Sequence, residues 1–241
     1  MIRFLLVCIT VIGFLILSIP ILIVEWIIGR FNPYKKDISS LHLIQSVFRF
    51  ILWLTGVEVT IIGEELVPTD EAVLYIGNHR SFFDILLTYT RCPRLTGYIA
   101  KAEMEKIPLL SNWMHYLHCL FLDRKDIKKG LKTILSGIEL IKSGISVCIF
   151  PEGTRSRNGN EIGEFKGGSF KSATKAKCPI VPVAIIDSYK AFDTKSIEPV
   201  TVQVHYLEPL YYDDYKMLKT NEIAEIVSKK IKKTIDNYTK C

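Results

Sequence analysis

The amino-terminal segment is almost wholly apolar, and no charged residue occurs between Phe4 and Val24. That run has about the ~20 residues that a helix needs to cross a hydrocarbon layer of about 30 Å. A signal peptide is the alternative, but its apolar core is usually only about 7–15 residues long and ends at a small-residue cleavage site. The residues that follow here, Glu25–Arg30, offer no such site. The pattern therefore predicts a retained membrane anchor.

Basic residues lie mainly after the apolar run. Arg30, Lys35 and Lys36 follow it, whereas only Arg3 precedes it. Positively charged flanks of a membrane segment tend to stay in the cytoplasm. We therefore expect a protein of the cell membrane whose downstream part, residues 57–241, lies on the cytoplasmic side.

The geometry of the anchor is open between two arrangements. Pro20 can kink the first helix, and Leu41–Leu54 is a second apolar stretch with helical spacing. A single span and a pair of helices inserted into one leaflet both fit residues 1–56, which we expect to form one membrane-associated helical segment.

After Gly56 the pattern changes to short apolar runs that alternate with longer amphipathic ones. Continuous apolar runs of this length are typical of strands that are covered on both faces. The predicted strands are Val57–Ile62, Ala72–Ile76, Gly97–Ala100, Cys119–Leu122, Ser146–Phe150, Ile180–Ile186 and Val200–Tyr206.

Helices are predicted between and after these strands. Ile127–Ile141 and Glu222–Tyr238 each have an apolar residue at every third or fourth position, which places one apolar stripe on each helix. Alternating strands and helices indicate an α/β fold with a mixed, mostly parallel sheet flanked by helices. Residues 57–241 are thus predicted to form a single domain.

Composition and charge narrow the function classes only slightly. The chain is 49% hydrophobic and 23% charged, which is typical of a folded protein, and its net charge of +6 suits an anionic membrane surface or a phosphorylated substrate. No zinc-finger spacing or aromatic-and-basic run supports a nucleic-acid partner. The six cysteines are scattered without a C-x-x-C pair, so we expect free thiols rather than a disulfide framework.

A polar cluster follows the second predicted strand and contains His79 and Asp84. Histidine has an unperturbed pKa of about 6.5 and can act as a base near neutral pH. The two residues can meet if His79 lies in the loop and Asp84 in the first turn of the next helix, where the carboxylate would orient the imidazole. The alternative is structural: Ser81 and Asp84 also have the spacing of a helix-capping pair.

A second cluster follows the strand that ends at Phe150. The sequence Pro151–Arg157 combines a tight turn with two arginines, and Gly167-Gly168 precedes a short helix predicted over Ser169–Ala176. Arg155 is suited to bidentate recognition of a phosphate, and Lys166 adds a point charge. A solvated basic loop is the alternative, but it would not need the surrounding glycines and proline.

Taken together and in this order, four blocks resemble the glycerolipid acyltransferases typified by 1-acyl-sn-glycerol-3-phosphate acyltransferase. The ordered combination is far more specific than any single block. The resemblance spans roughly residues 57–186 and rests on Asn78–Asp84 with its His-x4-Asp spacing, Lys101–Glu103 with Pro108 and Phe121–Arg124, Phe150–Arg157, and Ile180–Val183. Leu109-Leu110 stands where many members have a glycine, a difference that bears on acyl-chain selectivity.

The resemblance implies acyl transfer from a thioester of coenzyme A or acyl carrier protein to the sn-2 hydroxyl of 1-acyl-glycerol-3-phosphate. His79 is then the general base and Asp84 its orienting partner. The expected substrate-binding residues are Glu152, Gly153, Thr154 and Arg155, with Lys101, Arg124 and Lys166 as weaker candidates. No tightly bound cofactor is expected, and no metal, because the five histidines form no plausible ligand set.

Three rival functions follow from the same features. A transacylase would take the acyl group from an intact phospholipid through the same histidine and aspartate, and another lysophospholipid could replace the expected acceptor. A non-catalytic, membrane-anchored lipid-binding protein is disfavoured by the presence of both His79 and Asp84.

Overall fold

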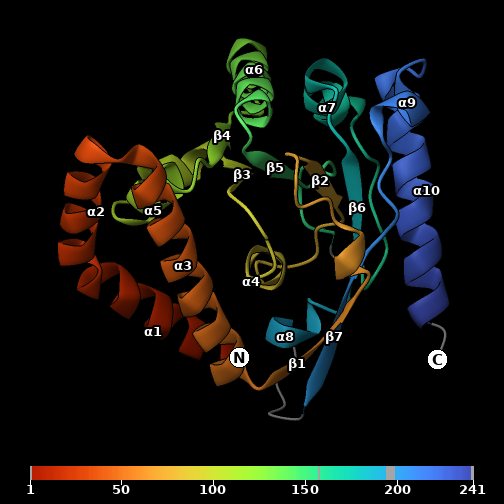
Figure 1. The fold of residues 1–241 in the computed structure, drawn as a ribbon. Helices are drawn as coiled ribbons and strands as arrows, with labels where there is room; N and C mark the ends of the chain where they lie inside the picture. The colour runs from red at the N-terminus through yellow and green to blue at the C-terminus, as the bar shows by residue number, and fades with distance from the viewer. Residues whose placement is uncertain (1, 157, 194–198, 240–241) are drawn as a thin grey trace.

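A computed structural model describes residues 2–156, 158–193 and 199–239. Its centre is a seven-stranded sheet with the order β1-β7-β6-β2-β5-β3-β4 (Figure 1). The strands are β1 (Val57–Ile62), β2 (Leu74–Gly77), β3 (Thr96–Lys101), β4 (Leu120–Leu122), β5 (Ser146–Ile149), β6 (Ile180–Ile186) and β7 (Val200–Tyr206). Every predicted strand is present, with ends within about two residues of the prediction, because a buried apolar run is a strong local signal.

The sheet is mixed and mostly parallel, as predicted. Of the described pairs only β6 and β7 run antiparallel, with Val183 opposite Tyr206. In contrast, β2 runs parallel to both of its neighbours, and Leu74 pairs with Val147 of β5 and Ile180 of β6. β3 likewise runs parallel to β5 and β4. The carboxyl ends of β2, β3, β4, β5 and β6 therefore share one edge of the sheet, which is where an α/β protein places its site.

Helices cover both faces of the sheet and form two hydrophobic cores. One face packs against α6 (Ile127–Lys142), α7 (Lys171–Ala176) and α10 (Thr220–Thr239). The helices predicted over Ile127–Ile141 and Glu222–Tyr238 are thereby confirmed. The predicted Ser169–Ala176 helix begins as a 3-10 turn, η3 (Gly167–Phe170), before α7.

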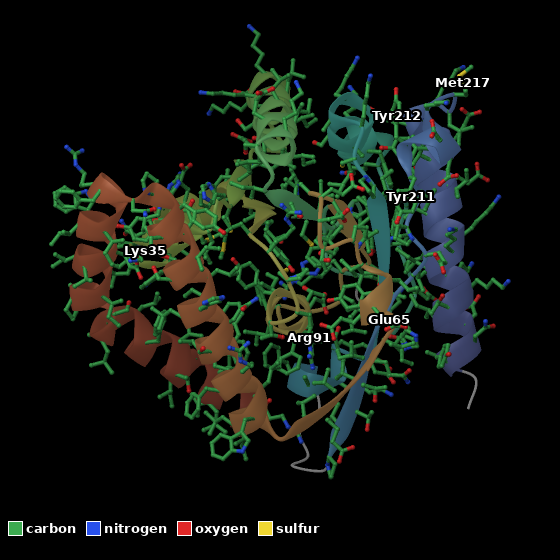
Figure 2. All side chains as sticks on the ribbon, viewed as in Figure 1. Lys35, Glu65, Arg91, Tyr211, Tyr212 and Met217 are labelled. Atoms are coloured by element: carbon green, nitrogen blue, oxygen red, sulfur yellow. The ribbon has the colours of Figure 1, made fainter. Side chains whose placement is uncertain are left out.

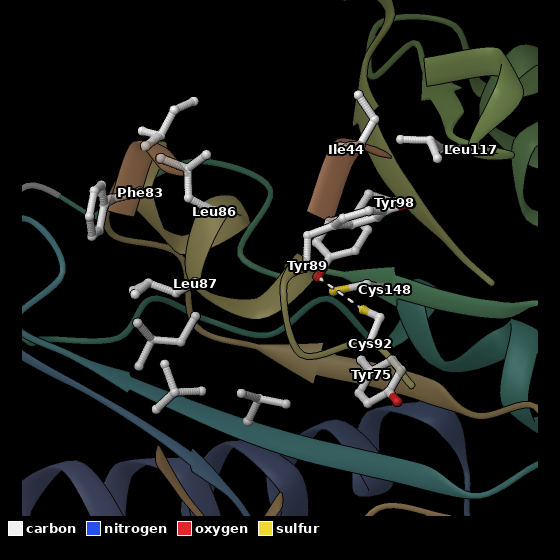
Figure 3. Packing of buried hydrophobic residues seen from close by; sticks show 14 of the residues in the cluster. Ile44, Tyr75, Phe83, Leu86, Leu87, Tyr89, Cys92, Tyr98, Leu117 and Cys148 are labelled. Carbon is white, nitrogen blue, oxygen red and sulfur yellow. Dashed lines mark hydrogen bonds between the residues drawn. The ribbon is translucent and has the colours of Figure 1, made fainter. Parts of the chain in front are cut away.

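The other face packs against the amino-terminal helices and α4 (Phe83–Tyr89). Figure 3 shows α4 between the sheet and α3 (Pro33–Thr55), with Phe83, Leu86 and Leu87 filling the space. Ile44 of α3 belongs to the same core. The shorter elements are α5 (Leu110–Tyr116), α8 (Lys190–Asp193), α9 (Tyr212–Tyr215), η1 (Glu64–Leu66) and η2 (Ala102–Lys106).

The amino-terminal apolar run does not form one straight helix. It divides into α1 (Ile2–Leu17) and α2 (Ile19–Phe31), which are bent by 54°. Pro20 lies in the first turn of α2, where a missing backbone N–H costs no hydrogen bond. The bend is held from outside: Nε1 of Trp113 donates a 2.9 Å hydrogen bond to the hydroxyl of Ser18. The kink expected from Pro20 is therefore present and packs against α5.

Two features of the amino-terminal helices bear on membrane association. By length and composition, α3 can span a membrane, and α1 with α2 could form one broken span. Many large apolar side chains of α1 and α2 are also exposed, among them Leu5, Ile9, Leu17 and Trp26. The opposite sides of these helices join the core through Val7 and Leu22, so the segment packs on the rest of the protein.

Candidate active site

The loop after β2 is fixed to the neighbouring strand by a buried asparagine. Nδ2 of Asn78 donates to the carbonyl of Ile185, and its Oδ1 accepts from the amide of Ile185, each over 2.8 Å. The side chain thus reproduces a backbone pairing one residue beyond the strand end. This holds the following residue, His79, at the carboxyl edge of the sheet.

His79 and Asp84 meet as the sequence suggested. Nδ1 of His79 lies 2.7 Å from Oδ2 of Asp84, whose side chain is fully buried, whereas the histidine side chain is 17% exposed. When Nδ1 carries the proton for this hydrogen bond, Nε2 is the ring nitrogen left to accept a proton. The pair therefore has the geometry of an oriented base open to solvent on one side.

Asp84 is held by more than the histidine. Its Oδ2 also accepts from the backbone amides of Arg80 at 2.7 Å and Ser81 at 2.9 Å, and its Oδ1 accepts from the hydroxyl of Ser188. These donors fix the direction of the carboxylate. The capping alternative is thus partly met as well, because the same oxygen ties the loop to the first turn of α4.

Residues of the β5 loop support the histidine from the other side. The ring of Phe150 stacks on the imidazole, with 4.4 Å between centroids and 14° between planes. The amide of Ser156 donates to the carbonyl of His79 over 3.0 Å. Both the ring and the backbone of His79 are consequently held by a segment about 70 residues away in sequence.

Glu152 links the two loops through its carboxylate. Its Oε1 accepts from the amide of His79 and its Oε2 from the amide of Gly163, both over 2.8 Å. Burial raises the pKa of Glu152 above its ordinary value, and the two amide hydrogen bonds and the charge of Arg80 oppose that shift. Glu152, which was expected to bind substrate, is therefore a buried cross-link between the two loops.

Two cations gather at the turn that follows. Gly153 has a φ of +73°, and a Cβ placed on it would lie 3.3 Å from Nζ of Lys166 and 3.6 Å from Cζ of Arg124. Glycine is favoured here because the left-handed backbone costs it little. Both cationic side chains are exposed at this turn. Arg124 and Lys166 thus approach each other only in the folded chain.

Arg155 lies at the same turn but takes a different direction. Its guanidinium lies 4.1 Å from the ring centroid of Phe82, in a cation–π contact. Among the described residues, no hydrogen-bond acceptor is recorded for its N–H groups. Arg155 and the neighbouring Thr154 are exposed. The stacking orients a planar fork of donors that is still open to a ligand.

One predicted site residue is not brought into this group. Lys101 ends β3 at the same edge of the sheet with an exposed side chain, and no hydrogen bond or ion pair to another described residue is recorded for it. Arg157, the second arginine of the motif, lies outside the described residues.

Comparison with known proteins decides the family. The acyltransferase family model matches residues 58–186, which is more than half of the chain. The matched range includes His79, Asp84 and Glu152. This chain belongs to the acyltransferase family.

Two relatives of this acyltransferase carry the same enzyme name. A probable 1-acyl-sn-glycerol-3-phosphate acyltransferase of Mycoplasma pneumoniae is 29% identical over 86% of this chain and 80% of its own. The 1-acyl-sn-glycerol-3-phosphate acyltransferase of Cocos nucifera is 31% identical over 74% of this chain and 58% of its own. The chain thus spans less than two thirds of some relatives that it matches.

A solved structure supports the fold of the acyltransferase. The crystal structure of the 1-acyl-sn-glycerophosphate acyltransferase PlsC from Thermotoga maritima superimposes with a TM-score of 0.84. The match covers 100% of this chain and 96% of that one at 23% sequence identity. The amino-terminal helices are therefore part of the shared architecture.

Several residues that organise the acyltransferase site were not assigned a role from the sequence. Ser188 is fully buried and contacts Asp84 across 104 positions of sequence. Its one local signal is that it follows the end of β6 at the same edge of the sheet. Asn78 and Phe150 stood inside the quoted motifs, but their contacts to Ile185 and His79 depend on strand order and could not be read from spacing.

Arg80 also lies within the Asn78–Asp84 motif, and no role was assigned to it from the sequence. It is buried, its Nη1 donates to the carbonyl of Glu161, and its guanidinium lies over the ring of Tyr189. Burial lowers the pKa of Arg80, and the charges of Glu152 and Asp84 oppose that shift. This cation offsets two buried carboxylates next to the histidine of the acyltransferase.

Proposed function

We propose that the protein transfers a fatty acyl group from a thioester to the sn-2 hydroxyl of 1-acyl-glycerol-3-phosphate, which gives phosphatidic acid for phospholipid biosynthesis. The observation that carries the proposal is the 2.7 Å contact between His79 and Asp84 beside a turn lined by Arg124, Lys166 and Arg155. Membership of the acyltransferase family and the shared designation of its relatives support the same reaction.

His79 acts as the general base in this proposal. Its Nε2 takes the proton of the acceptor hydroxyl while that oxygen attacks the carbonyl carbon of the thioester. The tetrahedral intermediate then collapses, the carbon–sulfur bond breaks, and the imidazolium returns the proton to the departing thiolate. The products are an ester and a free thiol, so no atom or charge is left over.

Asp84 keeps the histidine ready for each step. Its carboxylate holds the proton on Nδ1 and stabilises the imidazolium that forms when Nε2 is protonated. The backbone amides of Arg80 and Ser81 and the hydroxyl of Ser188 fix that carboxylate, so little reorganisation is needed during the reaction.

The phosphate of the acceptor binds at the turn after β5. Arg155 supplies a planar fork that matches two phosphate oxygens, and Arg124 and Lys166 add positive charge at Gly153. Thr154 and the backbone at Gly153 line the same turn. Lys101 is a weaker candidate, because it lies at the end of β3 without a hydrogen bond or ion pair to another described residue.

The acyl donor is a thioester of coenzyme A or of acyl carrier protein, and no tightly bound cofactor takes part. The acceptor is a lysophospholipid that lies in a membrane. The exposed apolar side chains of α1 and α2 support insertion of residues 1–56 into the cell membrane, with the catalytic part on the cytoplasmic side. Fractionation should recover full-length protein with membranes after a high-salt wash, since apolar insertion is not screened by salt; a shortened, soluble product would contradict this proposal.

The reaction itself is tested by a panel of donors and acceptors with product analysis by mass spectrometry. The proposal expects phosphatidic acid from a thioester and 1-acyl-glycerol-3-phosphate. Product formed from an intact phospholipid donor without any thioester would identify a transacylase instead. Lipid binding without turnover on any pair would identify a non-catalytic lipid-binding protein.

A further inference from the structure

The outer face of α6 combines basic and apolar side chains. Lys128 and Lys132 are exposed and lie one helical turn apart, and Leu131 and Leu135 beside them are 51% and 53% exposed. The inner face is buried through Thr133, Ile138 and other residues. Exposed leucines next to lysines give this face both an apolar and a positively charged character. This face is called the α6 face below and comprises Lys128, Leu131, Lys132 and Leu135.

The charge of the α6 face is not neutralised within the protein. No ion pair to another described residue is recorded for Lys128 or Lys132, whereas Lys129 is paired with Asp123 and Asp126. The neighbouring α7 adds Lys171 and Lys175, which are also exposed.

α6 and α7 pack closely enough to form one continuous surface. A Cβ at Gly137 of α6 would lie 3.2 Å from the hydroxyl of Ser172 of α7. Figure 2 shows long side chains tipped with nitrogen that project from both helices. The basic surface therefore extends beyond a single helix.

The α6 face begins next to the candidate active site. Asp126 caps the amino terminus of α6, and Arg124, only two residues earlier, contacts the turn at Gly153. A partner bound along α6 would consequently have a short path past Arg124 and Lys166 to His79. The surface is thus placed for delivery of a substrate.

A membrane does not fit this surface as well as a protein does. The exposed apolar side chains of α1 and α2 lie on helices that join one core of the sheet, whereas α6 and α7 join the other core. Figure 1 shows α1 at the lower left of the molecule and α6 at its top. The helices expected to enter the membrane and the α6 face therefore lie on opposite faces of the sheet.

We infer that the α6 face binds an acidic carrier protein that brings the acyl group as a thioester. The inference rests on the proposed function and commits it to a protein-borne donor. Acidic side chains of the carrier would pair with Lys128 and Lys132, while Leu131 and Leu135 would pack against its apolar surface. The acylated arm of the carrier would then reach His79 past Arg124.

The test compares two donors on matched variants of the full-length protein. Wild type, Lys128→Glu with Lys132→Glu, and the control Lys232→Glu with Lys233→Glu on α10 are each assayed with palmitoyl-acyl carrier protein and with palmitoyl-coenzyme A. The control makes the same charge change on exposed lysines of another helix. We expect kcat/KM for the carrier-protein donor to fall about tenfold or more in the α6 variant only. The value for the coenzyme A donor should stay within about twofold, because the variant leaves the catalytic residues untouched.

Each other outcome has a distinct meaning. An equal fall with both donors, or no fall with either, overturns the docking inference. So does a wild type that accepts only the coenzyme A donor, or an α6 variant that instead loses binding to anionic vesicles. A wild type that turns over neither donor contradicts the proposed function itself. A second variant, Leu131→Ser with Leu135→Ser, should reproduce the donor-selective loss without any change of charge.

Discussion

Oδ2 of Asp84 accepts hydrogen bonds from both the ring of His79 and the backbone amide of Arg80, each over 2.7 Å. One oxygen thereby closes the loop after β2 and orients the proposed base. The folding of this loop and the orientation of the imidazole consequently depend on the same carboxylate oxygen. This coupling explains why the five-residue spacing between the two residues matters.

Asp84→Asn should lower kcat/KM by about 10²-fold or more, because the amide no longer stabilises a positively charged imidazole. It should also lower the free energy of unfolding by about 1–3 kcal/mol through mismatched donors and acceptors. Steady-state kinetics and thermal melts measure the two effects. Ser81→Ala is the matched control, since it removes only the hydroxyl that accepts from the amide of Phe83. Intact activity with reduced stability in Asp84→Asn would reduce Asp84 to a capping role.

Ser188→Ala should reduce kcat while the KM for either substrate changes little. The substitution removes the hydroxyl that donates to Oδ1 of Asp84 in a fully buried position. We expect a loss of roughly threefold to tenfold, since the other three donors to Asp84 stay in place. Ser188→Thr keeps the donor and should recover most of the activity. A purely structural role would instead lower the melting temperature in both variants and leave kcat unchanged.

Glu152→Gln should destabilise the site and change the dependence of stability on pH. A glutamine can accept only one of the two amide hydrogen bonds from His79 and Gly163, and the expected cost is about 1–3 kcal/mol. Because the folded pKa of Glu152 is raised, the unfolded chain releases this proton first. Wild-type stability should therefore fall as pH rises through the interval between its unfolded and raised folded pKa values. Urea melts of both proteins as a function of pH test this, and an identical pH dependence would contradict it.

Arg155→Ala should raise the KM for 1-acyl-glycerol-3-phosphate more than the KM for the acyl donor. A charge-assisted hydrogen bond is typically worth about 1.5–3 kcal/mol, or roughly tenfold to a hundredfold in binding. Arg155→Lys keeps the charge without the fork and should also be impaired. Phe82→Leu removes the ring beneath the guanidinium and should have a smaller effect of the same kind.

An acceptor without phosphate provides the control for Arg155. Wild type and Arg155→Ala should use it almost equally poorly. If Arg155→Ala loses affinity only for the donor, Arg155 faces the phosphates of the donor, and the two substrate positions must be exchanged.

The sequence predicted the elements of the fold far better than their arrangement. Each strand is a local apolar run in the sequence, so all seven strands were predicted. The order β1-β7-β6-β2-β5-β3-β4 and the antiparallel pairing of β6 with β7 depend on contacts between distant segments. Pro20 was the local sign of the break at Ser18. The hydrogen bond from Trp113 that holds the bend could not be predicted, because Trp113 lies 95 residues away.

The same distinction applies to the site. His79 and Asp84 could be paired from their spacing once a loop and a first helical turn were assumed. The meeting of Arg124 with Lys166 at Gly153 and the stacking of Arg155 on Phe82 require the folded turn. Ser188 had no motif to mark it, so its contact with Asp84 was beyond what the sequence could predict.

The most direct test is the rate of phosphatidic acid formation by purified His79→Ala protein, measured by mass spectrometry with a thioester donor and 1-acyl-glycerol-3-phosphate. The variant should fold, because the side chain is partly exposed in a loop and its loss opens little of the core. We expect the rate to fall by about 10²–10⁴-fold, the range typical of removing a general base. An unchanged melting temperature together with this loss supports His79 as the base. Wild-type turnover by the variant would contradict the account.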